Sequence, residues 1–110
     1  ILKEDFPYKE YSILAKGIEL DIPVTVHIAV GSDVIHYHPL ADGEALGGAS
    51  LIDFQIFAGQ ISGLEGGGII INLCAAGILE KVLLNAITVS RNLGHKIKDF
   101  IIADLDTRAS

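Results

Sequence analysis

The chain alternates between stretches with a helical spacing of apolar residues and short runs that are apolar almost throughout. Apolar residues recur every three or four positions in three stretches, which predicts helices over 7–20, 49–61 and 77–93. The three short runs predict buried β-strands over 24–30, 69–73 and 101–105. The resulting order α-β-α-β-α-β is typical of parallel strands joined by right-handed crossovers. We therefore predict an α/β fold, a Rossmann-like parallel sheet with flanking helices.

Glycine, proline and small polar residues mark where these elements end. Pro23 ends the first helix, and the range 39–48, which holds three glycines, is predicted to be a loop. Ser50 is a candidate N-cap for the second helix. Gly94 is a candidate C-cap for the third helix. We interpret residues 1–110 as one α/β domain or a fragment of one.

The composition and net charge of the chain limit the kinds of partner that it can bind. Half of the 110 residues are apolar, and the mean hydropathy is +0.48, which is too apolar for a disordered chain. The net charge of −6 comes without any basic block, so we expect no nucleic acid and no membrane as partner. A short chain with so many apolar residues would expose large apolar patches as a monomer, which favours association. We therefore expect a homo-oligomer such as a tetramer.

Cys74 is the only cysteine, which excludes an intrachain disulfide and a cysteine-rich zinc site. One cysteine fits the reducing cytoplasm, where we expect the protein to be located, and we expect this side chain to be a small buried apolar group. The longest apolar run, over 68–79, is about half the length that a membrane helix requires.

The first candidate site is the turn that follows the predicted strand 24–30. Gly31 and Ser32 form the turn, and Asp33 can hold a cation, an amine or a ribose hydroxyl, or it can cap the next turn. His36 and His38 are two positions apart, so on a strand they would point the same way. They could line a ligand pocket, bind a metal ion or have purely structural roles. We predict a substrate site at Asp33, His36 and His38.

The second candidate site is the junction between the strand 69–73 and the helix that follows it. Small residues at such a junction let a phosphate approach the free N–H groups of a helix start, although tight packing alone also explains them. Acidic side chains after the strand 101–105 could accept hydrogen bonds from ribose hydroxyls, or simply be solvated. The predicted cofactor contacts, with the first turn included, are Gly31, Ser32, Asn72, Ala75, Ala76, Gly77, Asp104 and Asp106.

Both candidate sites follow predicted parallel strands. Because the carboxyl ends of such strands meet at one edge of a sheet, we expect the two groups to line a single cleft that holds a nucleotide. The sequence offers no nucleophile, base and orienting group that would form a catalytic triad. An acidic pocket would suit an amine-bearing substrate by charge complementarity.

With these motifs in view, the sequence resembles the deoxyhypusine synthase family, in particular its bacterial members. The range 32–38 resembles the family's Gly-Asp turn, followed by an apolar and aromatic stretch and a histidine. The range 75–86 aligns without gaps on the family's glycine-rich strand-to-helix junction, and 101–107 corresponds loosely to a third segment. The resemblance covers roughly residues 8 to 107, so we interpret the chain as the carboxyl-side half of a larger dinucleotide-binding core.

The resemblance implies NAD as the cofactor at the strand-to-helix junction and a polyamine at Asp33. The family's reaction oxidises spermidine with NAD and transfers an aminobutyl group to a lysine. This chain differs from the family at the junction, where Ala75 and Ala76 replace glycines, and at Lys81, which replaces a histidine. The family's Trp-Gly-Lys motif with the catalytic lysine is not found in these 110 residues. The alternative is a non-catalytic oligomeric α/β protein with another ligand or none.

Overall fold

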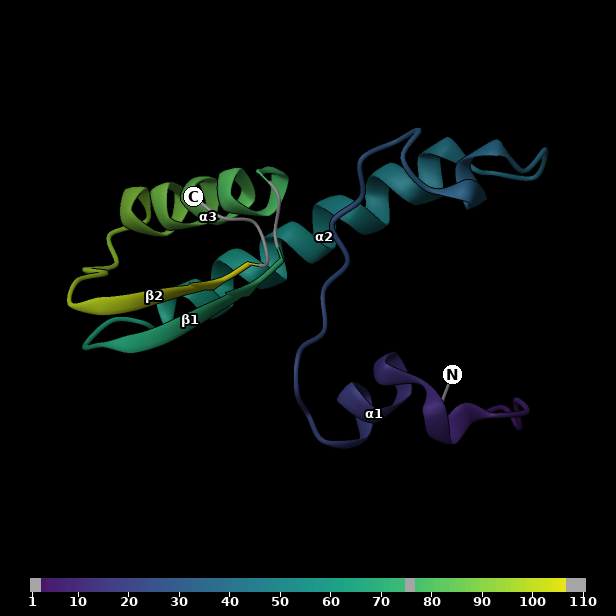
Figure 1. The fold of residues 1–110 in the computed structure, drawn as a ribbon, viewed down its shortest axis with the longest axis horizontal. Helices are drawn as coiled ribbons and strands as arrows, with labels where there is room; N and C mark the ends of the chain where they lie inside the picture. Colours follow the sequence, from purple (N-terminus) through teal and green to yellow (C-terminus); the bar gives the residue numbers. More distant parts are fainter. Residues whose placement is uncertain (1–2, 75–76, 107–110) are drawn as a thin grey trace.

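The computed structural model describes residues 3–74 and 77–106, and within them it contains three α-helices and two β-strands (Figure 1). Two short 3-10 helices, η1 and η2, precede α1 and α2 respectively. The elements in chain order are η1 (Lys9–Tyr11), α1 (Ile13–Glu19), η2 (Val34–Tyr37), α2 (Gly43–Ser62), β1 (Gly68–Leu73), α3 (Ile78–Asn92) and β2 (Phe100–Leu105).

The two strands are parallel and α3 connects them. Their register runs from Gly68 opposite Phe100 to Leu73 opposite Leu105. This arrangement confirms the predicted strands over 69–73 and 101–105 and the predicted helix between them, to within a residue or two at each end. Gly94 follows the end of α3 with a φ of +100°, and its N–H donates to the carbonyl of Arg91 at 3.0 Å. The predicted glycine signal at the end of this helix is therefore confirmed.

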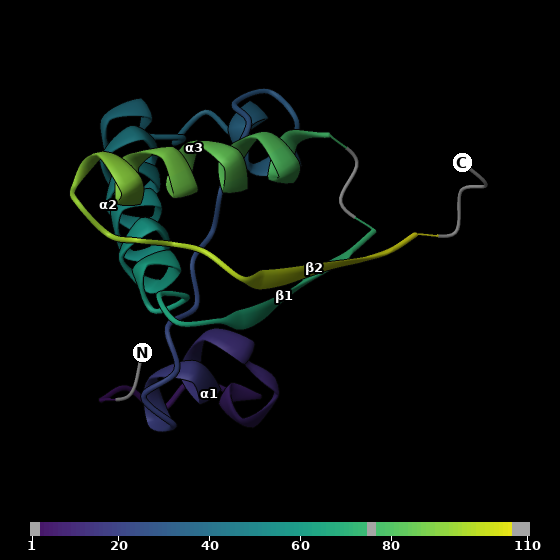
Figure 2. The same ribbon diagram turned by 90° about the vertical axis from the view of Figure 1, so that its left-hand side faces the viewer.

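The core lies between α2, α3 and one face of the sheet, as Figure 2 shows for the helices and the strands. Ile70 of β1 and Phe100 of β2 pack against this cluster from the sheet. The buried apolar residues of the cluster are Ala58, Ile61, Leu83, Ala86, Ile87 and Ile97. The carboxyl-terminal half of α2, α3 and the sheet thus form one packed unit, which fixes where the strands end.

The predicted strand over 24–30 is wrong, and with it the prediction of a three-stranded Rossmann-like sheet. These residues are extended, but they pair with neither strand, so the sheet of the described residues has the two strands β1 and β2. The N–H of Val26 donates instead to the carboxylate of Asp53 on α2, at 2.8 Å. β-Branched residues favour an extended backbone, but a strand also needs a neighbouring strand to pair with. This segment is hydrogen-bonded to a side chain of α2 instead.

The other two helices differ from their predicted limits because polar side chains cap them elsewhere. The first predicted helix is split, since Ser12 Oγ accepts the N–H of Ala15 at 3.2 Å and starts α1 at Ile13. The second starts at Gly43 rather than at 49, because Asp42 accepts two N–H groups of its first turn at 2.9 and 3.1 Å. The prediction of a loop is therefore wrong from Gly43 onward.

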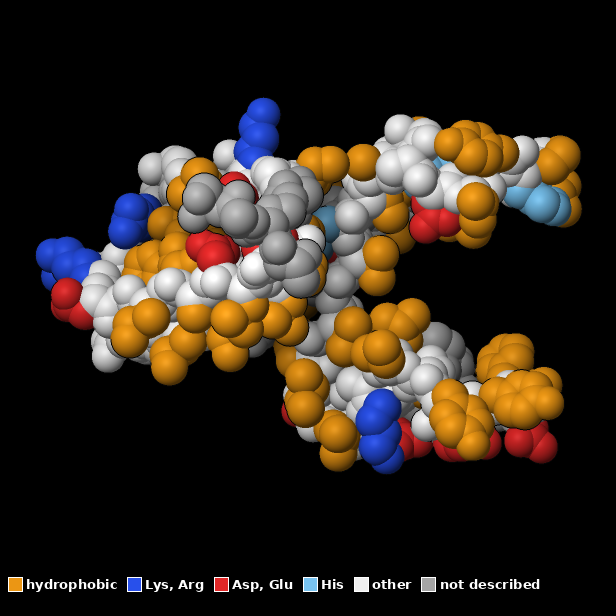
Figure 3. Space-filling model, viewed as in Figure 1, with side chains coloured by type: hydrophobic (Ala, Val, Ile, Leu, Met, Phe, Trp, Pro, Cys, Tyr) orange, Lys and Arg blue, Asp and Glu red, His pale blue; other side chains and the backbone are white. Residues whose placement is uncertain are grey.

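Apolar side chains remain exposed over much of the molecule, as Figure 3 shows along the sheet and around α1. Among the elements of the described residues, α1 contacts η1 alone. The Cα radius of gyration is 16.2 Å, whereas a compact domain of this length has about 13 Å. A helix with the length and apolarity needed to cross a bilayer does not occur in the described part of the chain.

Candidate functional site

The carboxyl ends of β1 and β2 bring two of the predicted cofactor residues together. Asn72 and Asp104 are opposite each other in the strand register, and Asn72 Nδ2 donates to Asp104 Oδ1 at 2.7 Å. The N–H of Cys74 donates to the carbonyl of Leu105 at 2.9 Å, which extends the pairing one residue past β1. The second oxygen of Asp104 has no hydrogen-bond partner among the described residues, so it can accept a hydrogen bond from a ligand.

A small acidic hollow of about 30 Å³ lies beside this pair. Three acidic residues are among those that line it: Glu80 in the first turn of α3, Asp104 in β2 and Asp106 just after it. A hollow of this size admits about one water molecule or one ligand hydroxyl or amino group. Its negative charge favours a group that donates hydrogen bonds or carries a positive charge.

The start of α3 is open to solvent. Gly77 precedes the helix with a φ of +75°, no side chain caps the first N–H groups, and no atom lies within 4 Å of where a Cβ would be. The unsatisfied N–H groups of a helix of this length favour an anion. Ala75 and Ala76, and residue 107 at the end of the aligned ranges, lie outside the described residues. Cys74 is exposed, so the expectation of a buried thiol is wrong.

The turn at Gly31 is closed by its own side chains. Ser32 Oγ donates to the carbonyl of Ala29, and Tyr37 Oη donates to that of Gly31, both at 2.6 Å. Asp33 Oδ1 accepts the N–H of Ile35 at 3.3 Å and caps η2. Capping was one of the two roles expected for Asp33, and the other, a contact to a ligand, stays a prediction.

His36 belongs to the same turn. Its Nδ1 accepts the N–H of Gly31 at 3.1 Å and that of Asp33 at 3.3 Å. An imidazole nitrogen that accepts hydrogen bonds carries no proton, so this pattern places the proton on Nε2. That Nε2 is buried and has no hydrogen-bond partner in the described part of the chain. The ring therefore organises the backbone of the turn, and a contact of His36 with a ligand stays a prediction.

His38 points elsewhere. Its Nδ1 accepts the N–H of Leu40 at 3.2 Å, and the ring lines an open apolar groove of about 530 Å³ at the start of α2. Neither Asp33 nor His36 lines that groove. Residues 3–74 and 77–106 contain no group of three or more His, Cys, Asp or Glu side chains that could hold a metal ion.

The two candidate sites do not share a cleft, so the expectation of a single cleft is wrong. Figures 1 and 2 both show the turn that holds Asp33 near the amino end of α2, apart from the strand ends that hold Asn72 and Asp104. The groove that His38 lines shares no lining residue with the two pockets that Asn72 lines. The reason is the extended segment 24–30, which does not join the sheet and so does not bring its turn to the same edge.

Sequence reasoning missed a histidine that does lie close to the strand ends. His27 and Thr25 line a pocket of about 190 Å³ together with Asn72 and Glu80. His27 Nε2 is hydrogen-bonded to Thr25 Oγ1 at 3.0 Å, and the ring packs edge-on against Phe57 with 5.3 Å between centroids. The signal in the sequence was a histidine and a threonine two apart, so that both point to one side of an extended run that is otherwise apolar.

Comparisons with protein-family models, with curated proteins and with solved structures find no match to this chain. The functional argument therefore depends on the geometry of the strand ends.

Proposed function

We propose that the β1–α3–β2 unit binds a nucleotide, with a dinucleotide such as NAD as the ligand. The observation that carries this proposal is the hydrogen-bonded pair of Asn72 and Asp104, at the carboxyl ends of two parallel strands and beside the open start of α3. Ligands of open parallel α/β sheets bind beyond the carboxyl ends of the strands, where helix starts and side chains from strand ends converge.

The ribose and the phosphate of the nucleotide each have a candidate partner in this unit. The second carboxylate oxygen of Asp104 would accept a hydrogen bond from a ribose hydroxyl. The first N–H groups of α3 would hold a phosphate, and the lack of a Cβ at Gly77 leaves room for its approach. NAD would supply hydride transfer when bound, and these residues would bind and orient it.

The acidic hollow supports a second candidate ligand, an organic cation such as a polyamine. Three acidic residues, Glu80, Asp104 and Asp106, are among those that line one small space. Such a site attracts an ammonium group and repels a phosphate. The resemblance to deoxyhypusine synthases implies both ligands, so we extend the proposal to an NAD-dependent transferase or oxidoreductase that acts on an amine. A non-catalytic oligomeric protein is the alternative.

Removing one negative charge distinguishes a site for NAD from a site for spermidine. Isothermal titration of the full chain with NAD, and separately with spermidine, compares the wild type with Glu80→Gln. We expect this substitution to tighten NAD binding several-fold and to weaken spermidine binding by a similar factor. Glu44→Gln is the matched control, because Glu44 lies in the first turn of α2 and away from the strand ends. It should change neither affinity.

Asp104→Asn directly tests the role of the pair formed by Asn72 and Asp104. It keeps the shape of the side chain but replaces a charged acceptor, so NAD affinity should fall about tenfold, which corresponds to about 1.4 kcal/mol. Wild-type protein that binds neither NAD nor spermidine at millimolar concentration would refute both candidates. Binding that survives unchanged in Asp104→Asn would show that the ligand lies elsewhere.

A further inference from the structure

The face of the sheet that points away from α2 and α3 is apolar and uncovered. The strand register places five large side chains on it, each 58–66% exposed, and we call them the outer face: Ile69, Ile71, Leu73, Ile101 and Leu105. They belong to the apolar surface seen along the strands in Figure 3. Parallel sheets are normally covered on both faces, because their strands are apolar on both sides. This face therefore lacks a covering layer.

A second uncovered apolar surface lies on the amino-terminal part of the chain. We call residues 3–20, which contain η1 and α1, the arm. Ile13, Leu14 and Ile18 of α1 are 43–78% exposed, and α1 contacts no other described element except η1. A helix of seven residues is not stable alone in water, so α1 needs a surface against which to pack.

The arm is held away from the sheet of its own chain. The N–H of Ile22 donates to the carbonyl of Gly17 at 2.9 Å, and Val24 packs so closely on Gly17 that a Cβ there would lie 2.5 Å from Val24 Cγ2. Two residues later Val26 is hydrogen-bonded to Asp53 of α2. The few residues between these contacts span at most about 14 Å. These contacts hold α1 beside its linker, and in the structure it contacts neither strand (Figure 1).

The exposed area is large enough for a stable interface. The accessible surface is 8589 Å², whereas a compact monomer of 11.7 kDa has roughly 5,900 Å². The excess over the whole chain, roughly 2,700 Å², leaves room for the roughly 1,000 Å² that each subunit of an obligate homodimer buries at the least. A second copy of the chain brings both missing surfaces at once, an apolar helix for the sheet and an apolar sheet for the helix.

We propose that two copies of this chain exchange their arms, so that α1 of each packs on the outer face of the other. Such an interface is closed by a two-fold axis, and each contact occurs twice. This inference goes beyond nucleotide binding and does not depend on it.

The first test measures the mass of the full chain by light scattering after gel filtration. We expect twice 11.7 kDa for the wild type. Ile18→Glu and Ile71→Glu should each yield the monomer, since a charge in an apolar contact is costly. Both positions are more than half exposed in the single chain, so a wild-type circular dichroism spectrum should accompany each change. Leu93→Glu is the control, because Leu93 is 75% exposed at the end of α3, and it should remain dimeric.

Mixing the two monomeric variants distinguishes exchange from other arrangements. A mixed dimer has one intact contact, between α1 of the Ile71→Glu chain and the outer face of the Ile18→Glu chain. We expect an equimolar mixture to recover dimers that neither variant forms alone. Three results would overturn the proposal: a monomeric wild type, a mixture that stays monomeric, or dissociation by Ile71→Glu without dissociation by Ile18→Glu, which would indicate that two sheets pack face to face.

Discussion

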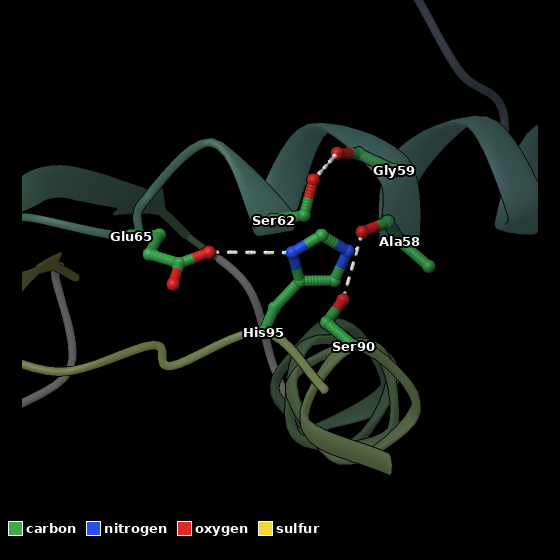
Figure 4. A network of polar contacts seen from close by, with 6 residues as sticks. All are labelled: Ala58, Gly59, Ser62, Glu65, Ser90 and His95. Carbon is green, nitrogen blue, oxygen red and sulfur yellow. Dashed lines mark hydrogen bonds and ion pairs between the residues drawn. The ribbon is translucent and has the colours of Figure 1, made fainter. Parts of the chain in front are cut away.

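Ser90 Oγ donates a hydrogen bond to the main-chain carbonyl of Ala58 at 2.9 Å, in the buried contact between α3 and α2 (Figure 4). Ser90 is 2% exposed, and it is the one polar residue that is buried in the described part of the chain. Apolar helix faces can slide past each other at little cost, but a directional hydrogen bond is made in one register only. This hydrogen bond therefore fixes the position of α3 along α2. It thereby also fixes the position of the candidate site at the start of α3.

Ser90→Ala should lower the free energy of unfolding by about 1 kcal/mol, because the hydrogen bond is lost and one buried carbonyl oxygen loses a donor. Denaturant unfolding followed by circular dichroism measures this change. Thr88→Ala is the matched control on the same helix, since Thr88 Oγ1 donates to the carbonyl of Leu84 at an exposed position. Its effect should stay within about 0.5 kcal/mol. Equal losses in the two variants would contradict the role assigned to Ser90.

The core also depends on a residue outside any helix or strand. Ile97 lies in the connection from α3 to β2 and is 1% exposed. Truncation to alanine should cost about 2–5 kcal/mol, and truncation to valine about 0.5–1.5 kcal/mol, because each leaves a cavity of different size. Thermal and chemical unfolding would check this order. Leu93→Ala removes a side chain that is 75% exposed and should have little effect. A small loss in Ile97→Ala would mean that the connection relaxes to fill the space.

Gly17 is required in α1 for the fit of the linker. A Cβ at this position would lie 2.5 Å from Val24 Cγ2 and 3.0 Å from the carbonyl oxygen of Ile22. Gly17→Ala should therefore break the hydrogen bond from the N–H of Ile22 to Gly17, although alanine favours a helix by up to about 1 kcal/mol. Amide hydrogen exchange at Ile22 should speed up at least tenfold.

A double substitution separates this clash from a general loss of structure. Val24→Ala removes the methyl group that meets the new Cβ, so exchange at Ile22 should slow again in the chain with both changes. Gly48→Ala is the control, because no atom lies within 4 Å of a Cβ at Gly48 in α2. It should stabilise the helix by about 0.5–1 kcal/mol. Unchanged exchange in Gly17→Ala would refute the packing described for the arm.

The sequence predicted the β1–α3–β2 half of the chain well, because local pattern and long-range packing agree there. Helical spacing in α3, a glycine just after its end and two apolar strands all indicate the same crossover unit, which places Asn72 beside Asp104. The first half was predicted less well, since its outcome depends on contacts that periodicity does not report. The run around Val26 has the composition of a strand, yet the N–H of Val26 donates a hydrogen bond to Asp53, 27 residues away in the sequence.

The candidate site shows the same division. His36 and His38 stood out because they are close in sequence, but each accepts hydrogen bonds from the backbone of its own turn. His27 drew less notice within an apolar run, and it is the histidine that shares a pocket with Asn72. Which side chains meet near the strand ends depends also on where the segment 24–30 lies, and its hydrogen bond to Asp53 helps to set that position. This position is a tertiary property that no local motif reports.

The pH response of the arm depends on Glu19. The hydrogen bond and the charge of Lys16, whose Nζ lies 2.9 Å from Glu19 Oε2, lower the pKa of this carboxyl below its ordinary value. A carboxyl whose pKa is lower in the folded chain stabilises it above the unfolded pKa, and this contribution is lost as the pH falls through the folded pKa. The effect on α1 should be small, because both groups are exposed.

Titration of Glu19 by NMR measures this shift in the full chain. Lys16→Gln should raise the pKa of Glu19 toward the ordinary value of a glutamate, since it removes the positive charge and leaves at most a neutral amide as donor. Lys98→Gln changes the net charge by the same amount near the start of β2, and it should leave the Glu19 titration unchanged. High salt should have a weaker effect than Lys16→Gln, because ions screen the charge but do not remove the hydrogen bond. A Glu19 titration that is identical in wild type and Lys16→Gln would show that the pair does not form in solution.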